Sequence, residues 1–100
     1  MHVCPAPDTY RGPHRGADAA ERYADYILQA CARGPKVCAL FTEPGMSVAG
    51  VIVPPEGYLA RAYAAVRAQG GVCVADEVQT GLGRTGLNWA FEQQGVVPDI

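Results

Sequence analysis

The sequence lacks the features that direct a chain to a membrane or to nucleic acid. No apolar run approaches the roughly 20 residues that cross a bilayer, and no charged and then apolar leader opens the chain. The net charge of −2 and the pI near 5.5 give no basic surface for nucleic acid. We therefore expect no membrane and no nucleic acid as a partner. The cytosol is the default compartment, and a mitochondrial form of a full-length protein stays open.

Metal and redox motifs are also missing. The four cysteines stand apart without a CxxC pair, which argues against a zinc site or a thioredoxin-type site. His2 and His14 have no second ligand three or four residues away, so we expect solvent-facing histidines and no metal. Three of the cysteines lie in apolar patterns and are interpreted as small core residues, a usage that fits a reducing compartment.

What is present is the composition of a globular domain, 49% hydrophobic and 18% charged in 100 residues, with helical periodicity in two segments. The first helix should follow a capping box formed by Asp18 and Glu21, and Gly34 should end it in the left-handed conformation before Pro35. The second should run from Gly57 to the glycines at 70 and 71. Their apolar faces comprise Ala20, Tyr23, Ala24, Ile27, Leu28 and Cys31 in the first helix, and Leu59, Ala62, Tyr63 and Val66 in the second.

Two short apolar runs, residues 37–41 and 72–75, show no alternation and predict strands buried on both faces of a parallel sheet. With the second helix between them they make a βαβ unit, so the expected fold class is α/β with a mostly parallel sheet. We also expect a strand-like piece at 51–53 and a short helix near 89–93. Residues 96–100 resemble the start of a third strand, and we therefore expect the sequence to be part of a longer chain.

Acidic residues follow both predicted strands. Glu43 comes after the first, and Asp76 and Glu77 come directly after the second. Parallel strands place these acids at one edge of the sheet, where open α/β sheets bind ligands. The competing interpretation is that such an acid caps the next turn or pairs with a nearby arginine. The residue pattern leaves both interpretations open.

Two nucleotide-binding patterns match only weakly. Residues 81–86, GLGRTG, fit GxGxxG, but five residues separate them from the strand and no long helix follows, so a dinucleotide site is disfavoured. VCVADE, residues 72–77, resembles a Walker B strand, but the chain has no GxxxxGK[ST] phosphate loop.

A longer string is more specific. ADEVQTGLGRTG at 75–86, continued by WAFE and VVPDI, resembles the class III aminotransferases, which are pyridoxal-phosphate enzymes of fold type I. PDTYRG at 7–12 and EPGMSVAGVIVPPEGYL at 43–59 extend the resemblance over most of the chain. It implies that residues 1–100 form a partial pyridoxal-phosphate-binding large domain with a mostly parallel sheet.

The resemblance also implies roles for three side chains. Asp76 matches the catalytic aspartate that faces the pyridine nitrogen of pyridoxal 5'-phosphate, where a carboxylate keeps the ring nitrogen protonated. Val78 matches the aliphatic residue on one ring face, and Gln79 the amide that hydrogen-bonds the phenolic oxygen. Glu77 should point the other way and be structural. Gly81, Gly83 and Gly86 are then glycines of a loop with positive φ.

The family's catalytic lysine has no counterpart among these residues. Lys36 is the only lysine, and it opens a strand at the wrong place in the order of motifs. The family's phosphate-binding segment has no counterpart either. We therefore expect the 100 residues alone to be inactive.

Glu43 matches a glutamate of the family near the substrate, and Val48 stands where many ω-amino-acid aminotransferases have a second glutamate. Val48 and the PDTYRG segment together favour the alanine-glyoxylate type and the related phospho-lyases of amino alcohol phosphates, with transamination preferred to phosphate elimination. The implied partners are an amino donor, a keto acid acceptor and a second subunit in a homodimer. The alternative is a purely structural domain, which would show cooperative unfolding of the isolated chain.

Overall fold

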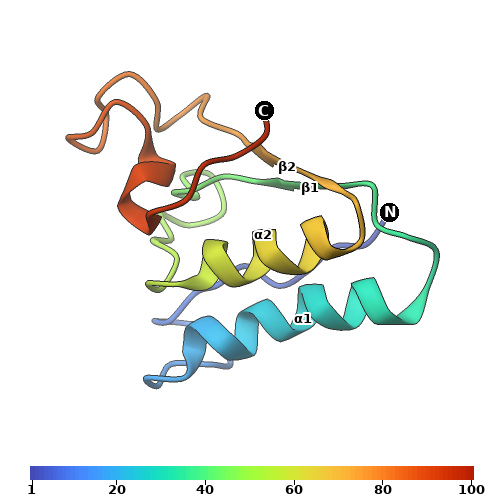
Figure 1. The fold of residues 1–100 in the computed structure, drawn as a ribbon. Coiled ribbons are helices and arrows are strands. Elements are labelled where there is room, and N and C mark those ends of the chain that lie inside the picture. The colour runs from blue at the N-terminus through green and yellow to red at the C-terminus, as the bar shows by residue number, and fades with distance from the viewer.

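The computed structural model describes all residues from Met1 to Ile100. Figure 1 shows a small sheet lying over one helix, which lies over a second helix. The elements follow the order α1 (Ala19–Arg33), β1 (Ala39–Thr42), α2 (Tyr58–Ala68), β2 (Val72–Ala75) and the 3-10 helix η1 (Ala90–Gln94). β1, α2 and β2 form the expected βαβ unit, and the α/β fold class is confirmed. No helix combines the length and the apolarity that crossing a membrane requires.

Helix α1 forms where its periodicity predicts, but its ends differ from the prediction. The Asp18 side chain caps no backbone N–H and instead pairs with Arg22 across 3.7 Å, so the capping box is wrong. Leu28 is 46% exposed, which leaves a narrower apolar face than expected. Gly34 is extended rather than left-handed. Its place before Pro35 explains this, because proline disfavours the helical conformation of the preceding residue.

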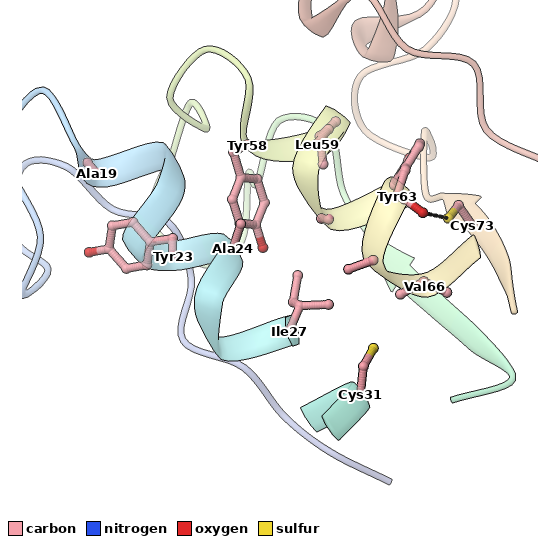
Figure 2. Close-up of a cluster of buried hydrophobic side chains, with 12 residues drawn as sticks. Ala19, Tyr23, Ala24, Ile27, Cys31, Tyr58, Leu59, Tyr63, Val66 and Cys73 are labelled. Atoms are coloured by element: carbon pink, nitrogen blue, oxygen red, sulfur yellow. Dashed lines mark hydrogen bonds between the residues drawn. The ribbon is translucent and has the colours of Figure 1, made fainter. Parts of the chain in front are cut away.

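Helix α2 buries all four predicted apolar positions, Leu59, Ala62, Tyr63 and Val66. They belong to one cluster with residues of α1 and with Cys73 of β2, and Figure 2 shows Tyr63 beside Cys73. The helix ends as predicted, since Gly70 adopts the left-handed region at φ 81°. The core therefore lies between the two helices and under one face of the sheet.

The two strands are parallel and pair from Ala39 with Val72 to Thr42 with Ala75. Gly71 permits this approach, because a Cβ at that position would stand 2.5 Å from the Val37 carbonyl oxygen. Burial on both faces is wrong for this chain, since Phe41 is 74% exposed. The helices of these 100 residues cover only one face of the sheet, and the other face stays open.

The last residues lie along the edge of β2 that faces away from β1. The N–H groups of Asp99 and Ile100 donate to the Cys73 carbonyl oxygen, and the Ala75 N–H donates to the Ile100 carbonyl oxygen at 2.9 Å. This is the hydrogen-bond pattern of a parallel pair, so the approach to a third strand is confirmed. Residues 51–53 form no strand, and only one bridge, between Met46 and Ile52, occurs there.

An ion pair fixes this third segment to the rest of the fold. The Asp99 carboxylate accepts from the Arg67 guanidinium at 3.0 Å and from the Cys73 N–H at 2.8 Å. Arg67 also donates to the Val97 carbonyl oxygen at 2.7 Å. Helix α2 and strand β2 thus hold the same carboxylate.

Candidate functional site

The ends of β1 and β2 meet at the edge of the sheet where the acidic residues were expected. The Asp76 N–H donates to the Thr42 carbonyl oxygen at 2.9 Å, one residue beyond the last strand pair. Glu43 therefore leaves β1 beside the point where Asp76 leaves β2. The prediction that both acids lie at one edge is confirmed.

Asp76 has one carboxylate oxygen committed to the local turn and one that is free. Oδ1 accepts from the Val78 N–H at 3.1 Å, which is an Asx turn. Oδ2 has no hydrogen-bond partner in the chain, and the residue is exposed. The turn-capping interpretation thus holds for one oxygen, while the other can accept a hydrogen bond from a ligand.

Val78 and Gln79 follow Asp76 on the open side of the same turn. Val78 is 88% exposed, so its aliphatic surface is free to contact a ligand. Gln79 is exposed, and its amide makes no hydrogen bond within the chain. The turn therefore presents a carboxylate oxygen, an aliphatic surface and an amide, all without partners of their own.

Glu77 is tied to the interior of the same loop, as the structural interpretation predicts. Its Oε2 accepts from the Thr80 hydroxyl at 2.6 Å, and its Oε1 accepts from the Phe91 N–H at 2.9 Å. Thr80 is buried, and Phe91 lies in η1. Sequence reasoning missed both partners; the three-residue spacing of a carboxylate and a hydroxyl was the available signal for Thr80.

The glycine-rich stretch 81–86 is a series of turns before η1. Gly83 and Gly86 have positive φ, 85° and 93°, as expected for loop glycines. For Gly81 that expectation is wrong: it lies against Trp89, and a Cβ there would stand 2.8 Å from the indole ring. Leu82 also has positive φ, 59°. No helix begins at the last glycine, so the chain lacks the strand-loop-helix arrangement that a GxGxxG dinucleotide site needs.

Glu43 shapes the loop that follows β1. Its Oε2 accepts from the Ser47 N–H at 3.2 Å, within a loop closed by the bridge between Met46 and Ile52. Val48 in this loop is 88% exposed. Gly45 lies against Thr80, since a Cβ at Gly45 would stand 3.2 Å from the threonine methyl group. The loops after β1 and β2 therefore touch at the edge of the sheet.

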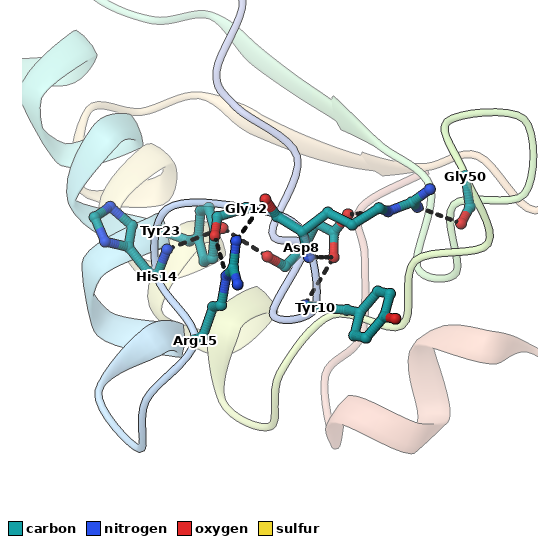
Figure 3. Close-up of polar contacts among 8 residues, drawn as sticks. Asp8, Tyr10, Gly12, His14, Arg15, Tyr23 and Gly50 are labelled. Atoms are coloured by element: carbon teal, nitrogen blue, oxygen red, sulfur yellow. Dashed lines mark hydrogen bonds and ion pairs between the residues drawn. The ribbon is translucent and has the colours of Figure 1, made fainter.

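The PDTYRG segment contacts the loop after β1, a link that sequence reasoning did not find (Figure 3). Asp8 accepts from the N–H groups of Tyr10 and Arg11 at 2.8 and 2.9 Å. The Arg11 backbone bond is the main reason that the pKa of Asp8 lies below its usual value. The Arg11 guanidinium reaches the Gly50 carbonyl oxygen, 39 residues along the chain, at 2.8 Å.

His14 lies away from the turn that carries Asp76, in the packing of the N-terminal segment on α1. No group of three or more His, Cys, Asp or Glu side chains is arranged to hold a metal ion. The expectation that His14 faces solvent is wrong, because its ring is half-buried and lies 5.0 Å from the Tyr23 ring. Its Nε2 lies 3.1 Å from the Tyr26 hydroxyl. His14 therefore belongs to the packing of the N-terminal segment on α1.

The model of the aminotransferase class-III family matches residues 1–100 of this chain. The chain belongs to the class III aminotransferases. It is 46% identical to an alanine–glyoxylate aminotransferase 2-like protein of Drosophila melanogaster, with all of the chain and 22% of that protein aligned. It is 36% identical to the human mitochondrial alanine–glyoxylate aminotransferase 2, over 94% of the chain and 23% of that protein.

Solved transaminase structures show the same arrangement of elements. An omega transaminase from Pseudomonas jessenii, solved in complex with PMP, superposes with a TM-score of 0.86 at 35% identity, over 96% of this chain and 22% of that one. A transaminase solved with L-alanine gives the same TM-score at 34% identity, over 96% of this chain and 24% of that one. The chain therefore spans about a quarter or less of the relatives that it matches, and the resemblance found in its sequence is confirmed.

Class III aminotransferases depend in general on pyridoxal 5'-phosphate, and the residues of this turn fit that group. A free Asp76 oxygen suits a protonated ring nitrogen, the exposed face of Val78 suits a flat ring, and the unpartnered Gln79 amide suits a phenolic oxygen.

Proposed function

We propose that these residues form the ring-binding part of a pyridoxal-phosphate site in an enzyme that moves an amino group between an amino acid or amine and a keto acid. Family membership supports this proposal. The observation that carries it is the free carboxylate oxygen of Asp76 at the carboxyl edge of the sheet, beside the exposed Val78 and Gln79.

Pyridoxal phosphate, when bound, supplies a pyridine ring that withdraws electrons from the carbon bearing the amino group. Asp76 acts by its charge: a carboxylate next to the ring nitrogen raises the pKa of that nitrogen and holds a proton on it. Val78 excludes water from one ring face, and Gln79 donates its amide N–H to the phenolic oxygen. The hydrogen bond from the Val78 N–H to Asp76 Oδ1 orients the carboxylate before any ligand arrives.

Lys36 does not serve as the covalent anchor of the cofactor in this proposal. It precedes β1, whereas Asp76 follows β2. Because the strands are parallel, Lys36 lies at the opposite edge of the sheet from Asp76. The 100 residues alone are then expected to be inactive, and activity requires a lysine from elsewhere in a complete enzyme.

The substrates in this proposal are an amino donor and a keto acid, and the complete enzyme is a homodimer. Two relatives are named as alanine–glyoxylate aminotransferases, and this supports alanine and glyoxylate as the first pair to test. Val48, in place of the second glutamate of many ω-amino-acid enzymes, supports the same choice. Phosphate elimination from an amino alcohol phosphate is the second candidate, because the PDTYRG segment and Val48 fit the related phospho-lyases as well as the alanine–glyoxylate type.

The test uses the complete purified enzyme loaded with pyridoxal phosphate. Alanine alone should change the absorbance of the bound cofactor to that of its amino form and release pyruvate; added glyoxylate should reverse the change. In parallel, phosphoethanolamine should release no inorganic phosphate. Phosphate release without any amino transfer would replace the proposed function with the second candidate. The absence of both reactions would contradict both candidates.

A further inference from the structure

The PDTYRG segment is built around one arginine. Asp8 is mostly buried, with a side chain 15% exposed, and it holds Arg11 twice. Oδ1 accepts from the Arg11 N–H at 2.9 Å, and Oδ2 accepts from Arg11 Nε at 3.0 Å. The Tyr23 hydroxyl donates to the Asp8 carbonyl oxygen at 2.8 Å, which fixes this turn on α1. The guanidinium is therefore oriented before it meets any distant group.

The distant group is the carbonyl oxygen of Gly50 in the loop after β1. Arg11 Nη2 donates to it at 2.8 Å, and this is the one hydrogen bond that joins the N-terminal segment to that loop. The two segments are so close that a Cβ at Gly50 would collide with the guanidinium. Gly50 also has φ 126°, where other residues are strained. Glycine therefore suits position 50, because of the close guanidinium and because of the positive φ.

From Gly50 a continuous path of hydrogen bonds leads to the edge of the sheet. The N–H groups of Gly50 and Val51 donate to the Ser47 carbonyl oxygen at 3.2 and 3.0 Å. The Ser47 N–H donates to Glu43 Oε2 at 3.2 Å. Met46 and Ile52 exchange two backbone bonds at 2.9 and 2.8 Å. The loop is thus a compact unit, held by Glu43 at one end and by Arg11 at the other.

The loop also contains a residue with a strained backbone conformation. Val51 is β-branched and has φ 55°, a backbone conformation that is strained for such a residue. Its side chain and that of Val48 are more than four-fifths exposed, at 83% and 88%. Arg11 gives this loop, with its strained residue and exposed aliphatic groups, a contact to another segment of the chain.

We infer that Arg11 is a positioning residue: oriented by Asp8, it holds residues 45–52, the loop that follows Glu43, in one place at the edge of the sheet that carries Asp76. The inference rests on the proposed function, because it makes this loop a wall of the substrate site. Arg11 touches neither the cofactor nor the reacting atoms. It acts on substrate binding through the loop.

The experiment compares Arg11→Ala and Arg11→Lys with a matched control, Arg22→Ala, in the complete enzyme. Arg22 is also an exposed arginine paired with an aspartate, but its partner Asp18 is only four residues away, directly before α1. Hydrogen exchange of residues 46–52 and steady-state kinetics with alanine and glyoxylate are the two readouts. Guanidinium ion, added to Arg11→Ala, tests for chemical rescue.

In Arg11→Ala we expect the amides of residues 46–52 to exchange about five-fold faster, and KM to rise about five-fold with little change in kcat, as for the loss of one hydrogen bond. Arg11→Lys should be intermediate, guanidinium should restore part of the loss, and Arg22→Ala should match the wild type. Unchanged exchange in the loop would overturn the inference. A fall in kcat alone, or an equal effect in Arg22→Ala, would do so too. Hydrogen exchange needs no turnover, so it decides the inference even if the enzyme proves not to be an aminotransferase.

Discussion

The Asp76 N–H donates to the Thr42 carbonyl oxygen across 2.9 Å, so the ends of β1 and β2 are joined by main-chain atoms alone. This bond fixes where the Asp76 side chain leaves the sheet, and no side chain takes part in it. Asparagine at this position, which keeps an oxygen for the Val78 N–H, should therefore leave the backbone of the site in place. Chemistry and fold can be tested separately at this residue.

Glu77 should affect cofactor binding more than turnover. Its two oxygens hold Thr80 and the Phe91 N–H, so Glu77→Ala frees the turn that carries Val78 and Gln79. We expect the dissociation constant of pyridoxal phosphate to rise about ten-fold, because each of these bonds is worth about 1 kcal/mol or more, while kcat at saturating cofactor stays close to that of the wild type. Fluorescence titration of the apoenzyme measures the change. Glu21→Ala, an exposed residue of α1 without a hydrogen bond, is the control; equal cofactor affinity in both variants would contradict the prediction.

Loss of the hydroxyl group should change the stability of the fold differently at two buried tyrosines. The Tyr23 hydroxyl donates to the Asp8 carbonyl oxygen at 2.8 Å, whereas the Tyr63 hydroxyl is buried without a partner. Burial, followed by the nearby Cys73, raises the pKa of Tyr63 to about 12. Tyr23→Phe should lower the free energy of unfolding by about 1 kcal/mol, and Tyr63→Phe should leave it unchanged or raise it by up to about 1 kcal/mol. Thermal unfolding midpoints of the two variants give the order, and a lower midpoint for Tyr63→Phe than for Tyr23→Phe would contradict it.

Asp99 should make the attachment of the third segment sensitive to acid. The hydrogen bond from the Cys73 N–H, and then that from Arg67, lower the pKa of Asp99 in the folded state. A lowered pKa stabilises the fold fully above the ordinary value of about 4, and the contribution is lost as the pH falls through the lower, folded value. Wild type should therefore exceed Asp99→Asn in stability at neutral pH, and the difference should shrink below pH about 4. Urea unfolding at several pH values measures this difference, with Asp25→Asn as the control; a difference that does not vary with pH would refute the assignment.

The parts of the fold that local pattern determines were predictable. The apolar spacing of α2 gave its buried face, and the two runs around it gave a parallel pair with acids at one edge. The prediction failed where a neighbouring residue determines the conformation or the hydrogen-bond partner. Pro35, rather than the freedom of glycine, determines the conformation of Gly34 at the end of α1. The Asp18 carboxylate pairs with Arg22 and does not cap the helix.

The candidate site was predictable to a similar degree. The position of Asp76 followed from strand order, and the structural role of Glu77 followed from alternation along an extended chain. The contact of Arg11 with Gly50 could not be found, because it joins residues 39 positions apart and depends on how two loops approach. The exposure of Phe41 likewise depends on which face of the sheet is covered, and its own sequence does not determine that.

Turnover of Asp76→Asn in the complete enzyme tests the central claim most directly, because asparagine keeps the shape and removes the charge. A control variant, Asp18→Asn, makes the same change at the exposed residue that precedes α1. The account predicts that Asp76→Asn binds pyridoxal phosphate and folds normally but loses about a hundred-fold or more in kcat, as when one preorganised electrostatic group is removed. Turnover close to that of the wild type, with the cofactor bound, would contradict the assignment of Asp76 as the charge beside the ring nitrogen.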